Sequence, residues 1–113
     1  MIGLDVNAID SRHSTPLHWA TFAGADLALS FLVANGAELD AQDLKGLTPM
    51  HLAVKTSENM RTTRLIRGLL LKGADPQIQD HNGRLPVDFV EEFDINHLDA
   101  QEFAESIKEL VGA

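Results

Sequence analysis

Apolar residues recur along the chain at the three- and four-residue spacing of short amphipathic helices. Leu17 and Ala20 lie three residues apart, and Met50 and Ala53 repeat that spacing further along. Small residues at such positions allow neighbouring helices to pack closely. The pattern over the whole chain predicts an all-α fold, with helices at about residues 16–23, 26–34, 49–56, 61–71, 86–93 and 99–111.

The second helix of each of the first two pairs has a denser apolar pattern, at i, i+4 and i+5. We expect these residues to pack inward: Leu27, Phe31 and Leu32, then Leu65, Leu69 and Leu70. Gly36 and Gly73 follow the two helices, where a C-cap favours positive φ.

The first helix of each pair has a clear start signal. Thr15 and Thr48 each precede a proline, which is favoured at the first helical position because it has no N–H to leave unpaired. A threonine just before it is a good N-cap, since its hydroxyl accepts from an unpaired N–H of the first turn. We therefore expect both threonines to begin helices.

These signals belong to a repeat. Thr15-Pro16-Leu17-His18-Trp19-Ala20 recurs as Thr48-Pro49-Met50-His51-Leu52-Ala53, 33 residues later. A degenerate third copy, Leu85-Pro86-Val87-Asp88, follows after 37 residues, so we place an insertion of four residues near 56–61, between two predicted helices. Fixed offsets of this length are typical of stacked repeat architectures.

The repeat resembles the ankyrin repeat, a 33-residue unit of a β-turn and two antiparallel helices. The resemblance implies one domain over residues 1–113, a solenoid of about three repeats at roughly 5–37, 38–74 and 75–113. It also implies structural roles at matching positions: a Thr–His hydrogen-bond network, and a turn glycine that the first repeat replaces with His13. These structural residues are Thr15, His18, Thr48, His51, Gly46 and Gly83.

The last repeat carries most of the charge. The chain has 9 basic and 17 acidic residues, a net charge of -8, and residues 88–113 alone contribute -7. Such a balance disfavours nucleic-acid binding, which needs clustered Lys and Arg. Because a terminal repeat exposes its outer face to water, this acidic repeat is expected to be a C-terminal cap. Its inward-facing residues are predicted to be Phe93, Phe103, Ile107 and Leu110.

The N-terminal end has no comparable polar helix. The chain begins at the β-turn of a repeat, so Leu17, Ala20 and Leu27 are expected to lack cover on one side. We therefore expect a segment excised from a longer repeat array. The alternative is a naturally short array with an adhesive end.

Candidate chemistry is sparse. The chain has no cysteine, and its five histidines lack the spacing of a metal site, so we expect no metal and no cofactor. Asp10, Ser14 and His18 lie too close together to form a catalytic triad, and nothing favours an enzyme. There is no membrane-length apolar run and no secretory signal. We expect a cytoplasmic monomer, or a module at the cytosolic face of a membrane within a larger protein.

Binding to a protein or peptide is the predicted function. In the resembling family, partners contact the loop tips and the exposed side of the first helices. Basic and apolar residues at the matching positions favour an acidic or mixed partner segment. The predicted partner-binding residues are Arg12, Ser14, Phe22, Leu44, Lys45, Leu47, Lys55, His81, Asn82 and Arg84. Ordinary solvent-exposed tips are the alternative.

The insertion brings three arginines, Arg61, Arg64 and Arg67, to one helix face. We expect them to match the charge of the acidic C-terminal helix. A basic patch for a partner or an anionic lipid surface is the alternative.

The insertion and the leucine-rich helix that follows also resemble the cytosolic ankyrin region of protist DHHC-type palmitoyltransferases. That resemblance implies a non-catalytic module that recruits substrates, with the transmembrane catalytic part beyond this chain. The alternative is a free-standing soluble scaffold or inhibitor, similar to the ankyrin inhibitors of cyclin-dependent kinases.

Overall fold

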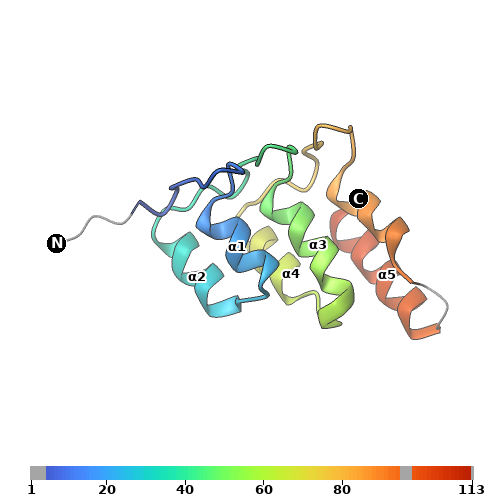
Figure 1. The fold of residues 1–113 in the computed structure, drawn as a ribbon. Coiled ribbons are helices and arrows are strands. Elements are labelled where there is room, and N and C mark those ends of the chain that lie inside the picture. The colour runs from blue at the N-terminus through green and yellow to red at the C-terminus, as the bar shows by residue number, and fades with distance from the viewer. Residues whose placement is uncertain (1–4, 95–97, 113) are drawn as a thin grey trace.

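The computed structural model describes residues 5–94 and 98–112, which form two layers of short helices (Figure 1). One layer contains α1 (Pro16–Phe22), α3 (Pro49–Met60) and the 3₁₀ helix η1 (Pro86–Glu92); the other contains α2 (Asp26–Ala34), α4 (Arg64–Leu71) and α5 (Leu98–Val111). Within the described residues there is no strand. The molecule is elongated, 51 × 28 × 22 Å. The predicted all-α solenoid of helix pairs is confirmed.

The first helices begin where the threonine–proline pairs predict. Thr15 and Thr48 have extended backbones, and each hydroxyl accepts a hydrogen bond at 3.3 Å from the backbone N–H three residues later. In the third repeat the hydroxyl is lost, as expected, because Leu85 stands at that position. The Asp88 carboxylate still accepts a 2.7 Å bond from the Leu85 backbone N–H.

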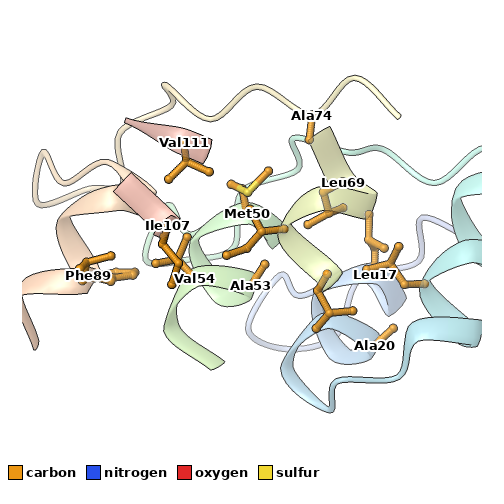
Figure 2. Close-up of a cluster of buried hydrophobic side chains, with 14 of the residues drawn as sticks. Leu17, Ala20, Met50, Ala53, Val54, Leu69, Ala74, Phe89, Ile107 and Val111 are labelled. Carbon is orange, nitrogen blue, oxygen red and sulfur yellow. The ribbon is translucent and has the colours of Figure 1, made fainter. Parts of the chain in front are cut away.

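The core runs along the solenoid between the two layers (Figure 2). Leu17 and Met50, which occupy equivalent repeat positions, are both fully buried. At the C-terminal end Phe93 and Ile107 are buried, and Phe103 and Leu110 are partly buried against the core, as predicted. Each repeat therefore buries its apolar face against its neighbour, as stacked repeats require.

The prediction for α2 is partly wrong. Leu27 is 87% exposed and Phe31 is 65% exposed, whereas Leu29 is buried. The expectation that Leu17, Ala20 and Leu27 lack cover is wrong for Leu17 and Ala20, which are buried, and right for Leu27. The i, i+4 spacing identifies residues that share a helix face, but only the contact with α1 and α4 decides which face is inward.

The insertion lengthens a helix instead of a loop. Helix α3 continues through Met60, four residues beyond the predicted end, and Arg61 stops it with a left-handed backbone at φ 51°. The Met60 side chain then packs over Gly24, where a Cβ would collide with it. The helix expected from residue 61 therefore begins at Arg64.

Candidate functional site

Three loop tips project from the layer of α1, α3 and η1, and each is organised by one aspartate. In the first tip, the Asp10 Oδ1 accepts from the backbone N–H groups of Arg12 and Ser14 at 2.8 and 2.9 Å. Asp43 and Asp80 accept the equivalent pairs in the second and third tips, all at 2.9 Å. Hydrogen bonds from these N–H groups lower the pKa of Asp10, and the bond from the Ser14 N–H has the largest effect. The carboxylate therefore stays ionised and keeps accepting.

Neighbouring tips are joined by single main-chain hydrogen bonds. The Leu44 N–H donates to the Arg12 carbonyl at 3.0 Å, and the His81 N–H donates to the Lys45 carbonyl at 2.9 Å. This close approach leaves no room for a side chain at Gly46: a Cβ there would lie 2.5 Å from the His81 ring. Gly46 also has a φ of 78°, so both space and backbone conformation require glycine.

The two repeat histidines lock the tips to the helices. His51 Nδ1 accepts from the Thr48 N–H at 3.1 Å, and its Nε2–H donates to the Arg84 carbonyl at 2.9 Å. His18 makes the equivalent bonds in the first repeat, reaching the Leu47 carbonyl at 2.7 Å. Burial lowers the pKa of His51 below its ordinary value, although the Arg84 carbonyl opposes the shift. His51 is therefore a neutral structural bridge between repeats.

A groove of about 530 Å³ lies between the first two tips, beside α1 and α3. Six of the predicted partner-binding residues contribute to its lining: Arg12, Ser14, Phe22, Leu44, Lys45 and Leu47. Phe22 and Leu44 are 59% and 55% exposed, and Arg12 and Lys45 are exposed beside them. The structure thus gathers exposed apolar surface and two cations in one place.

Trp19 also lines the groove, although it is not among the partner-binding residues predicted from the sequence. Its indole N–H donates to Asp10 Oδ2 at 2.9 Å, and its ring meets Phe22 edge-on, with centroids 6.3 Å apart. Half of the tryptophan is exposed. The sequence offered only a partial signal: tryptophan is enriched at interfaces, but the equivalent residue in the second repeat, Leu52, is an ordinary apolar residue, and the exposure of Trp19 is seen only in the structure.

The other four predicted residues are not among those lining this groove. His81 and Asn82 are exposed on the third tip. Lys55 lies with its ammonium 5.8 Å from the centre of the Phe89 ring. The Arg84 guanidinium stacks on the Phe89 ring, 4.4 Å from its centre, and forms ion pairs with Asp80 at 3.5 Å and Glu92 at 3.1 Å. It is therefore already engaged within the chain.

The arginines were expected to pair with the acidic C-terminal helix, but the ion pairs differ from this prediction. Arg64 pairs with Asp26 of α2 at 3.6 Å. On α5, Lys108 pairs with Glu105 at 3.4 Å and with Glu91 at 4.0 Å. The reason is that α4 lies against α2, which places the arginine beside that aspartate.

Among residues 5–94 and 98–112, no group of three or more His, Asp or Glu side chains is arranged to hold a metal ion. None of the helices described is long and apolar enough to cross a membrane.

Comparison with known proteins gives matches of two kinds. The family profile "Ankyrin repeats (3 copies)" matches residues 1–80. "Palmitoyltransferase ZDHHC17" of Danio rerio is 37% identical over 73 residues, 64% of this chain and 12% of that protein. "Palmitoyltransferase ZDHHC13" is 39% identical over 56 residues in Homo sapiens, 49% of this chain and 9% of that protein.

The matched segment is therefore a small part of each relative, about a tenth of its length. The family profile, by contrast, spans well over half of this chain, and the helix pairs, capping threonines and bridging histidines are all present in the structure. The chain belongs to the ankyrin-repeat family.

Proposed function

We propose that this chain is a non-catalytic interaction module that holds an extended segment of a partner protein in the groove between its first two loop tips. The observation that carries the proposal is the exposed aromatic and aliphatic surface of Trp19, Phe22 and Leu44, with Arg12 and Lys45 beside it. Exposed apolar anchors ringed by charge are the pattern that protein interfaces use.

The main chain of the tips supports recognition through side chains. Asp10 and Asp43 occupy the N–H groups of Arg12 and Lys45, and the Leu44 N–H bonds to the neighbouring tip. Few backbone donors are left here for a partner, so strand addition is disfavoured. The partner segment would insert an apolar side chain against the aromatic pair and place a carboxylate near the two cations. An acidic or mixed segment fits this groove best.

The relatives provide a context for the module. Both relatives described above are named as palmitoyltransferases, and this chain matches about a tenth of their length. We propose that the chain recruits substrates for such an enzyme at the cytosolic face of a membrane, while another part of the protein performs the acyl transfer. The alternative is an independent scaffold or inhibitor.

The groove is tested by selecting binders from a displayed library of random peptides. Trp19 is the chain's only tryptophan, so its fluorescence reports groove occupancy for each selected peptide. Leu44→Ala removes an apolar anchor, and Leu27→Ala is the matched control, an exposed leucine on α2 that does not line the groove. We expect Leu44→Ala to weaken binding at least tenfold, or about 1.4 kcal/mol, and Leu27→Ala to change it less than twofold.

Equal losses in both variants, or a library that yields no groove-dependent peptide, would remove the basis for this site. Lys45→Glu tests the charge preference, because it should weaken acidic peptides more than neutral ones and lessen their salt dependence. For the recruiting role, a selected peptide is attached to a cysteine-containing reporter. Zebrafish ZDHHC17 carrying this chain in place of its matched segment should then acylate that reporter faster than one without the peptide. Equal rates would favour the scaffold alternative.

A further inference from the structure

The outer layer of the solenoid carries a second surface, distinct from the groove. We define the outer basic patch as Leu27 of α2, Arg64, Arg67 and Leu71 of α4, and Lys72 just after it. Arg64, Arg67 and Leu71 follow i, i+3, i+7 spacing and so share one helix face. The 3.6 Å ion pair between Arg64 and Asp26 holds the first turn of α2, which carries Leu27, near the start of α4.

The charge of this region is opposite to that of the chain. Residues 59–74 contain four basic residues and no acidic one, in a protein of net charge -8. The Arg64 side chain is 73% exposed although it pairs with Asp26, and both Arg67 and Lys72 are exposed. Clustered cations on one face attract anionic surfaces at short range, within a Debye length of about 8 Å at physiological salt.

The apolar members of the patch protrude instead of lining a hollow. Leu27 and Leu71 are 87% and 86% exposed, more than any other large hydrophobic side chain described. Protruding leucines among cations are suited to the interface of a bilayer, where the leucines enter between headgroups and the cations meet lipid phosphates and carboxylates. We propose that the outer basic patch docks the solenoid on an anionic phospholipid membrane.

The acidic α5 defines how the molecule would lie. Its exposed Glu102, Glu105 and Glu109 are repelled by an anionic surface, and α5 lies at the opposite end of the solenoid from α2 (Figure 1). The molecule would therefore rest on its α2–α4 side with the C-terminal helix tilted away. The groove of the proposed function lies beside the other helix layer, next to α1 and α3, and would stay open to a partner.

The test is co-sedimentation of the 113-residue chain with two kinds of vesicle: phosphatidylcholine alone, and phosphatidylcholine mixed with phosphatidylserine. We expect binding to the mixed vesicles only, weakening as salt is added. Arg67→Ala with Lys72→Ala keeps the Arg64–Asp26 pair and should weaken binding roughly twenty-five-fold, since each charge contributes about fivefold. Arg12→Ala with Lys45→Ala removes the same charge at the groove and should change binding less than twofold.

Leu71→Ser tests insertion: it should weaken binding to mixed vesicles severalfold without altering the salt dependence. Thermal melts of all variants check that each is folded. The proposal is overturned by absent binding to mixed vesicles, by equal binding to neutral ones, or by equal losses in the two double variants. An unchanged affinity of Leu71→Ser overturns it as well. Tighter binding to polyglutamate than to the mixed vesicles would assign the patch to an acidic protein and also overturn it.

Discussion

Replacing Thr48 separates the two contributions that this residue makes to α3. Its hydroxyl accepts from the His51 backbone N–H and lies 2.9 Å from His51 Nδ1, while its methyl group is fully buried. Thr48→Val removes the hydroxyl and keeps the shape. Thr48→Ser keeps the hydroxyl and removes the methyl group, and Thr48→Ala removes both.

The expected sizes follow from these contacts. Loss of a threonine N-cap costs about 1 kcal/mol of unfolding free energy. Loss of one buried methyl group costs about 0.8 kcal/mol. Thr48→Ala should therefore destabilise the chain by about 2 kcal/mol, and each of the other two variants by about half of that. For a domain of this size, 2 kcal/mol corresponds to a fall in Tm of roughly 10 °C.

Urea titration and thermal unfolding, both followed by circular dichroism, measure the three variants against the unchanged chain. We expect Thr48→Ala to be the least stable variant. The stability losses of Thr48→Val and Thr48→Ser should nearly add up to the loss of Thr48→Ala. Suppose that Thr48→Val leaves the free energy of unfolding unchanged, while Thr48→Ser lowers it as much as Thr48→Ala does. That result would show that the hydroxyl does not cap α3. Packing of the methyl group would then be the only role left for this residue.

Two further predictions concern the tips and their histidine. Gly46 and Gly83 have nearly the same φ, 78° and 77°, but only at Gly46 would a Cβ meet the His81 ring and backbone. Gly83→Ala should lower the free energy of unfolding by about 1 kcal/mol through backbone strain alone, and Gly46→Ala should lower it at least twice as much. Urea unfolding measures both variants, and equal losses would contradict the close approach of His81 to Gly46. Because burial lowers the pKa of His51 in the folded chain, the unfolded chain binds a proton there first, as pH falls through about 6.5. The stability due to neutral His51 is therefore complete above that pH and declines below it. Thermal melts from pH 8 to pH 5 should show this decline in stability, and His51→Gln should make the decline smaller. An NMR titration that places the His51 pKa at or above its ordinary value would contradict the prediction.

Much of the candidate site could be predicted from tip positions, because a repeat places equivalent residues at equivalent points of the solenoid. Arg12, Leu44 and Lys45 were expected together and do line one groove. Arg84 occupies the same repeat position as Leu47, yet its side chain turns to Asp80, Glu92 and Phe89. Asp80 has counterparts in Asp10 and Asp43, but Phe89 and Glu92 stand where the second repeat has Leu52 and Lys55. Equivalence of position therefore did not carry over to equivalence of environment.

Trp19 is the opposite case, a groove residue that its repeat position did not identify. Its position within the helix suits an ordinary core residue as well as an exposed one, and only the bond to Asp10 and the open side of α1 make it part of the groove. The outer basic patch likewise depends on α2 lying beside α4, which brings Leu27 to residues nearly forty positions away in the chain.

The sequence alone determined the fold family, the starts of α1 and α3 and the repeat period, because capping residues, prolines and apolar spacing act over a few neighbouring residues. Tertiary structure decided which face of α2 is buried, that the insertion extends α3 through Met60, and where the arginines find partners. Each of these depends on which helix packs against which. Such contacts join residues distant in sequence, and no local pattern specifies them.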